Sequence, residues 1–377
     1  MIKLLIVLAG IIFITQVVRI FEISNFLSKS KNEVTDESNN VNGILLLFAG
    51  VALVLFFFWQ KAMWMDLTLQ NPASEHGLEV QALWDTTMGL IVIVFLILTP
   101  VLFGFSFLYR GKETNTASYI THNNKLEVFW TAIPAVVLFV LIGYGLSVWG
   151  KIVNQDISDA IVIEVYAKQF GWTARYAGAD NTLGKADVRF VGGKNELGVI
   201  STHTKEAQIA DIDNKILKLE NDLLTNPSAG ARKLISQRKD KLMKKKKVLM
   251  TYFIMTDENE LLFAEDDFVV KELHLPVNKK VLFKFRSQDV IHSAYLPHFM
   301  VQMNCVPGTT TQFAFTPTIT TDNMKKELEN SEFEYVLLCN KICGNAHYNM
   351  QMKVIVETEE EYNNWVEEQE SKKIINL

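Results

Sequence analysis

The chain has 377 residues, a formal net charge of −5 and a mean hydropathy of +0.13. Its hydrophobic content of 49% is high for a soluble protein of ordinary charge, and its length allows two domains. These values argue against an ordinary soluble domain, and the negative net charge gives no support for nucleic-acid binding.

Four apolar stretches near the N-terminus account for the high hydrophobic content. Those at 88–109 and 127–149 are long enough to cross a bilayer core of about 30 Å, whereas those at 4–18 and 43–59 are shorter. Lys3 precedes the first stretch, as in a secretory signal. The following "TQVVRIFEIS" has no small-x-small cleavage site, which favours a retained helix.

We therefore expect about four transmembrane helices, two additional ones within 1–62 and a helical hairpin within 63–150. Lys and Arg are more frequent in the loops after the first and third stretches than after the second, which has only Lys61. The positive-inside bias then puts both chain ends outside the cytoplasm. Residues 151–377 are thus expected on the periplasmic face of a multi-pass inner-membrane protein.

The outer part has short β-like runs that alternate apolar and polar residues, which predicts an all-β sandwich or Greek-key barrel. One segment differs, because apolar residues at spacings of three, four and seven within 205–249 predict a helical hairpin inserted between strands. This segment has twelve Lys and Arg against six Asp and Glu. Such a charge run is commonly a solvated face, and the alternative is docking on a partner subunit or donor protein.

The short stretch "CNKICGNAHYNM" combines Cys339, Cys343, His347 and Met350. In an oxidising compartment two cysteines form a disulfide by default, but this explains neither the histidine nor the methionine. Thiolates and a thioether with imidazole select copper, and two cysteines rather than one suggest thiolates that bridge two copper ions. Zinc is the rival metal, although structural zinc rarely recruits a thioether.

A dinuclear centre needs a second imidazole from elsewhere. Spacing alone favours His292 or His298 over His203 and His274, without deciding between the first two. The third cysteine, Cys305, is expected to be a buried free thiol.

These residues resemble the subunit II family of haem–copper oxidases, in its cytochrome c oxidase branch, over most of the chain. The family pattern C-x-E-I-C-G-x-x-H-x-x-M is met by "CNKICGNAHYNM". The upstream pattern S-x-D-V-x-H-S is met by "SQDVIHS", which selects His292. In the last apolar stretch "LEVFWTAIPA" resembles the family's E-x-x-W-T-x-x-P.

The resemblance implies a membrane-anchored, cupredoxin-like barrel that holds the dinuclear copper centre CuA. It makes Cys339 and Cys343 the bridging ligands and His292 and His347 the terminal ones. Met350 and the backbone carbonyl of Lys341 become the weak axial ligands. The family has Glu at position 341, where its side chain helps to bind magnesium at the boundary with subunit I. Lys341 cannot do so, which puts that magnesium site in doubt.

The resemblance also suggests roles for three other residues. The family's electron-entry signature Q-W-x-W is present as "QFGW", with Phe170 in place of Trp and Trp172 retained, although an aromatic residue in a strand is often only core. Glu127 matches the family residue at the mouth of a proton-uptake channel, although an acid at that position could simply lie at the membrane interface.

The implied protein is the electron-accepting subunit of a proton-pumping terminal oxidase. A c-type cytochrome or a neighbouring respiratory complex would reduce copper, and the resemblance implies that haem groups lie only in the partner subunit I. The chain has no C-x-x-C-H motif, so it carries no attached c-type haem. Two alternatives differ in class. A quinol oxidase subunit II typically lacks the copper ligands, and a membrane-tethered copper chaperone would need a thioredoxin-like alternation of helices and strands.

Overall fold

The computed structural model describes residues 35–65, 71–192, 195–225, 228–255 and 261–374, with a few isolated positions between 10 and 20. The chain divides into two compact units. One comprises residues 1–69 and 83–144, and the other comprises residues 70–82 and 145–377.

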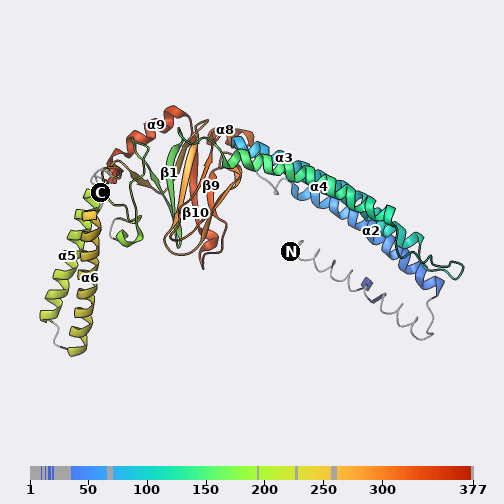
Figure 1. Ribbon diagram of the computed structural model, residues 1–377, viewed down its shortest axis with the longest axis horizontal. Coiled ribbons are helices and arrows are strands. Elements are labelled where there is room, and N and C mark those ends of the chain that lie inside the picture. The colour runs from blue at the N-terminus through green and yellow to red at the C-terminus, as the bar shows by residue number, and fades with distance from the viewer. Residues whose placement is uncertain are drawn as a thin grey trace. The chain divides into compact units, whose positions relative to one another are not determined.

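Three long helices are apolar enough to cross a membrane: α2 (Asp36–Trp64), α3 (Glu75–Leu108) and α4 (Asn124–Val153) (Figure 1). The apolar stretch 43–59 lies inside α2, whose 29 residues make it long enough to span a bilayer. The first expected helix, at 4–18, lies mostly outside the described residues. The three described helices therefore support a membrane-anchored protein.

Glycines of α2 allow it to approach α3 closely. A Cβ atom added to Gly50 would come within 2.5 Å of the Phe103 side chain, and one added to Gly43 would come within 3.3 Å of the Phe107 side chain. Small residues that let two helices touch are the usual means of packing helices in lipid, where no hydrophobic force drives helices together.

The outer domain is built from two five-stranded sheets. The strands have the bounds β1 (Ile161–Lys168), β2 (Gly171–Tyr176), β3 (Phe268–Val270), β4 (Leu273–Pro276), β5 (Val281–Ser287), β6 (His292–Leu296), β7 (Val301–Cys305), β8 (Thr311–Phe315), β9 (Tyr335–Cys339) and β10 (Gln351–Glu357). Their orders are β3-β2-β1-β5-β8 and β4-β10-β9-β6-β7. The all-β prediction for the outer domain is confirmed.

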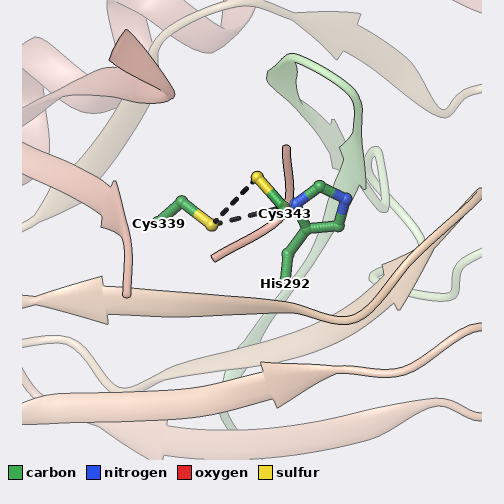
Figure 2. A group of neighbouring side chains, drawn as sticks. All are labelled: His292, Cys339 and Cys343. Carbon is green, nitrogen blue, oxygen red and sulfur yellow. Dashed lines mark hydrogen bonds between the residues drawn. The ribbon is translucent and has the colours of Figure 1, made fainter. Parts of the chain in front are cut away.

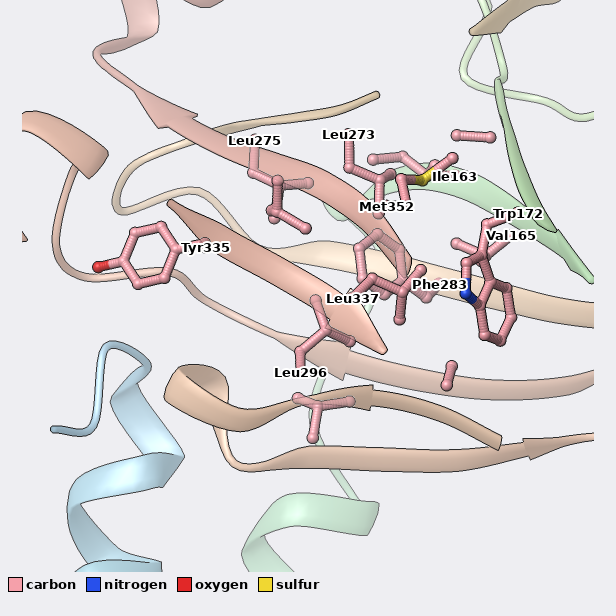
Figure 3. Packing of buried hydrophobic residues seen from close by; sticks show 14 of the residues in the cluster. Ile163, Val165, Trp172, Leu273, Leu275, Phe283, Leu296, Tyr335, Leu337 and Met352 are labelled. Carbon is pink, nitrogen blue, oxygen red and sulfur yellow. The ribbon is translucent and has the colours of Figure 1, made fainter. Parts of the chain in front are cut away.

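Apolar side chains from both sheets meet in one core (Figure 3). Ile163 and Val165 of β1, Phe283 of β5 and Leu337 of β9 are all fully buried within it. Since burial of one such side chain contributes roughly 1.5–3 kcal/mol, this core fixes the sheets that carry the site residues.

The inserted helical hairpin consists of α5 (Thr202–Thr225) and α6 (Ala229–Met255), between β2 and β3. Ile212 of α5 and Leu249 and Phe253 of α6 pack on Phe190 in a separate small core. Both helices extend beyond the expected bounds of 205–249.

The remaining elements of the described residues are the α-helices α8 (Thr321–Glu327) and α9 (Glu359–Glu368) and the 3₁₀ turns η2 (Val188–Phe190), η3 (Pro297–Phe299), η4 (His347–Asn349) and η5 (Gln369–Lys372).

Candidate metal centre

The cysteine loop connects two antiparallel neighbours, because β9 ends at Cys339 and β10 begins at Gln351. Strand β6 lies on the other side of β9, with Ala294 opposite Cys339. His292, two residues earlier on β6, is thereby brought to the base of the loop. Sheet topology thus joins residues that are 47 positions apart in the sequence.

The side chains of His292, Cys339 and Cys343 converge so that their ligand atoms lie within 4.8 Å of one another (Figure 2). The Cys339 Sγ atom lies 3.8 Å from Cys343 Sγ and 3.8 Å from His292 Nδ1. The two cysteines are free. Within the described residues this is the one group of three or more His, Cys, Asp or Glu side chains with such spacing.

The loop supplies three further donor atoms to the same place. Cys343 Sγ lies 3.6 Å from His347 Nδ1 and 3.7 Å from Met350 Sδ, while the Cys339 thiol donates to the carbonyl of Lys341 at 3.3 Å. Both histidines therefore present Nδ1 to a cysteine sulfur. All six residues predicted from the sequence and the resemblance lie together.

The donor set fits copper better than the rival metal. Copper favours soft or intermediate ligands, and the donors here are two thiolates, two imidazoles and a thioether. A tetrahedral zinc site would be complete with the two cysteines and two histidines, so it would not need Met350. Burial, and next the adjacent Cys339 thiol, raises the pKa of Cys343 to about 11. Because metals bind the thiolate, a metal that binds here displaces protons.

Asp289 is a residue whose role the sequence did not reveal. Its Oδ1 lies 2.9 Å from His292 Nε2, and its Oδ2 accepts from the backbone N–H of Gln169 at 2.7 Å. Burial raises the pKa of Asp289, but these bonds and one from the Val290 N–H outweigh it and lower the pKa overall. A carboxylate on the far nitrogen is the usual way to orient a metal-binding histidine.

The two candidate electron-entry residues occupy different environments. Trp172 is buried, with Nε1 donating to the Met350 carbonyl at 3.4 Å and its ring 6.1 Å from the ring of His292. Phe170 is 43% exposed and packs over Gly344, and the neighbouring Gln169 amide donates to the carbonyl of Cys343. Trp172 therefore supports the loop from beneath, whereas Phe170 reaches the surface.

The other candidate residues lie apart from this cluster. His298 is buried against Phe333 and Tyr335, and His274 stacks on Trp365 with Nδ1 3.0 Å from Glu357. His203 lies at the start of α5, the first helix of the inserted hairpin.

Cys305 and Glu127 also lie outside the metal cluster. Cys305 is a free thiol without exposed surface, and burial raises its pKa to about 12. Glu127 is partly exposed in the first turn of α4, with Oε1 3.7 Å from His122 Nδ1.

Comparison with known proteins points to one family along most of the chain. Residues 62–148 match the transmembrane domain of cytochrome c oxidase subunit II, and residues 242–358 match its periplasmic domain. Together these matches cover more than half of the sequence. The inserted α5 lies outside both.

Whole-chain relatives agree. The chain is 26% identical over 330 residues to an alternative cytochrome c oxidase subunit 2 of Bradyrhizobium diazoefficiens. This alignment covers 87% of this chain and 91% of the relative. It is 23% identical over 300 residues to cytochrome c oxidase subunit 2 of Cereibacter sphaeroides, over 79% of this chain and 78% of the relative.

Among solved structures, the periplasmic domain of subunit II of cytochrome oxidase from Bradyrhizobium japonicum aligns with 18% identity and a TM-score of 0.28, over 56% of this chain and 95% of that one. The assignment rests on the sequence matches and on the domains that they name. The chain belongs to the cytochrome c oxidase subunit II family.

Proposed function

We propose that this oxidase subunit accepts single electrons at a dinuclear copper centre, CuA. Cys339 and Cys343 would bridge the two ions, and His292 and His347 would each bind one through Nδ1. Met350 and the Lys341 carbonyl would be the weak axial ligands. Bound copper would supply a one-electron redox site. The observation that carries the proposal is the convergence of two sulfurs, two Nδ1 atoms and a thioether, with neighbouring atoms 3.6–3.8 Å apart.

The chain's own residues would hold this site rigid and largely dry. His292, Cys343 and Met350 are buried, so water has little access to three of the donors. Asp289 would fix the orientation of His292, and the Gln169 and Trp172 side chains would anchor the carbonyls of Cys343 and Met350. Such constraint favours electron transfer, because little rearrangement accompanies a change in charge.

Electrons would enter from a c-type cytochrome, or the haem domain of a neighbouring complex, near Phe170. Three further apolar side chains near the site are exposed, namely Ile291, Ile342 and Tyr348. The electrons would pass to haem in subunit I. Glu127 would admit protons at the cytoplasmic end of α4, with the copper domain on the periplasmic side of the inner membrane. The β-sandwich argues against the chaperone alternative, and the full ligand set argues against a quinol oxidase subunit.

The test is copper stoichiometry and electron paramagnetic resonance on the full-length chain in detergent. One electron shared by two equivalent copper nuclei splits the signal into seven lines, whereas one nucleus gives four. We expect two coppers per chain and the seven-line pattern, lost in Cys343→Ser and retained in Cys305→Ser, which also removes a buried thiol. A single copper with four lines, or a preference for zinc, would contradict the bridging role.

A further inference from the structure

A polar cavity lies within the unit formed by residues 70–82 and 145–377, far along the chain from the cysteine loop. Its volume is about 190 Å³, much larger than the roughly 30 Å³ that one water takes in the liquid. The first turns of α3, the end of α4 and the segment after it, and one end of the sheet that contains β5 and β8 form its walls. The lining residues are Glu75, His76, Glu79, Lys151, Ile152, Gln155, Lys280 and Thr316.

The helices set the level of this cavity in the membrane. No charged residue occurs on α4 between Glu127 and Lys151, so the charge-free run 128–150 has 23 residues. At about 1.5 Å per residue it spans about 35 Å, slightly more than the bilayer core of about 30 Å. Lys151 therefore lies at the head-group level. Trp149, which is 62% exposed, is the kind of residue that anchors a helix there.

The cavity wall combines both signs of charge. Lys151 Nζ lies 2.6 Å from Glu79 Oε1, and Lys280 Nζ donates to the Asp156 carbonyl at 2.8 Å. Because an ammonium group has three N–H donors, each lysine can donate further hydrogen bonds to a ligand. Glu75 forms no ion pair within the described residues. Two ammonium groups and two carboxylates facing one space are complementary to a zwitterion rather than to an ion of one sign. A cation site is disfavoured, because the lysines would repel it.

His76 adds a preference for a group that carries N–H donors. Its Nε2 lies 3.4 Å from the Met300 carbonyl, which assigns the proton to Nε2 and leaves Nδ1 as an acceptor. That Nδ1 is buried and has no partner within the described residues. A donor brought into the cavity would satisfy this acceptor together with the carboxylates of Glu75 and Glu79.

We infer that this cavity binds the head group of an aminophospholipid in the outer leaflet. Lys151 and Lys280 bind its phosphate, and Glu75 and Glu79 bind its primary ammonium. A choline head group carries no N–H on its nitrogen and a glycerol head group carries no cation there, so the site discriminates against both. The inference does not depend on copper binding.

Native mass spectrometry of the full-length chain, released from nanodiscs of equal phosphatidylethanolamine, phosphatidylcholine and phosphatidylglycerol, tests this. We expect one retained phosphatidylethanolamine, favoured several-fold over the other two. Glu75→Gln should bring phosphatidylethanolamine and phosphatidylcholine to equal retention, because the ammonium loses its unpaired carboxylate. Lys280→Met should lower the retention of every phospholipid.

Lys279→Met is the matched control, since Lys279 precedes Lys280 but pairs with Glu359 at 3.0 Å and does not line the cavity. It should behave as wild type, and an unchanged thermal midpoint in each variant excludes misfolding. Equal retention of the three lipids by the wild type would overturn the inference, as would equal effects of the two lysine variants. Loss of the lipid on adding millimolar inorganic phosphate would also overturn it, because it would identify a free-phosphate site.

Discussion

The imidazole of His292 is held between Asp289 and Cys339, with Nε2 2.9 Å from the Asp289 carboxylate and Nδ1 3.8 Å from the Cys339 sulfur. The carboxylate therefore determines which nitrogen faces the cysteines. A rigid metal site requires that the ring of its histidine ligand keep one orientation. Asp289, in the short turn between β5 and β6, fixes the orientation of the His292 ring.

Replacing Asp289 with Asn should weaken copper binding by about tenfold to a hundredfold, the usual cost of losing such a partner. A competition titration with a copper chelator measures this directly. Asp322→Asn is the control, because Asp322 is an exposed acid of α8 whose ion pair is with Lys325 and not with a ligand. Equal affinities of Asp289→Asn and wild type would show that packing alone orients His292.

Trp172→Phe should lower the free energy of unfolding by about 1–2 kcal/mol, because the variant loses the bond from Nε1 to the Met350 carbonyl together with buried ring surface. Chemical denaturation of the full-length chain in detergent measures the change. If stability were unaffected while electron uptake slowed, Trp172 would be a conduit rather than a support.

Phe170→Leu should show the opposite pattern. Since the ring is 43% exposed, the change in stability should stay within about 0.5 kcal/mol. The rate at which a reduced c-type cytochrome transfers its electron, followed by stopped-flow absorbance, should fall several-fold. An unchanged rate, with Tyr348→Leu slower instead, would move electron entry from Phe170 to Tyr348.

The pH dependence of stability should include a term from His298. Burial lowers its pKa from 6.5 to about 4, so between these values the unfolded chain binds a proton that the folded chain does not. Stability from this residue is fully present above pH 6.5 and declines as the pH falls towards 4. The thermal midpoint of the wild type should fall more steeply over this range than that of His298→Phe. Parallel curves would contradict the prediction.

The sequence predicted the elements of the site better than the contacts between them. Alternation gave the strands, and the spacing of soft ligands gave the loop, because both are local patterns. Spacing could not decide between His292 and His298, since that depends on β6 lying next to β9. The contact of Asp289 with His292 is local, three residues along the same turn, but the sequence pattern does not say which ring nitrogen the carboxylate meets. The contact of Gln169 with the Cys343 carbonyl has no local signal, because it joins two separate loops. The apolar stretch 43–59 predicted too short a helix, because the polar residues at both ends of α2 also belong to it.

Arg175→Met should lower the free energy of unfolding by about 3–5 kcal/mol. The buried guanidinium of Arg175 pairs with Glu164 at 2.6 Å and with Asp267 at 2.8 Å, and both of these carboxylates are buried. Arg286→Met is the matched comparison, since Arg286 also pairs with Glu164 at 2.6 Å but is less buried. It should cost clearly less in the same denaturation experiment. Equal losses would mean that the shared partner Glu164, and not burial of the arginine, determines the cost.

Glu127→Gln should slow oxygen consumption by the assembled oxidase several-fold while leaving the copper signal intact. Glu127 lies in the first turn of α4, partly exposed and 3.7 Å from His122, where a carboxyl group can exchange protons with water. The amide cannot carry a proton, although it keeps the size and the hydrogen bonds of the acid. Glu113→Gln, in the loop that precedes α4, removes the same charge from the same side of the membrane and serves as the control. Turnover and proton uptake measured together separate the possibilities: a loss in Glu127→Gln alone identifies a proton-entry residue, whereas equal losses in both variants would reduce the effect to surface charge.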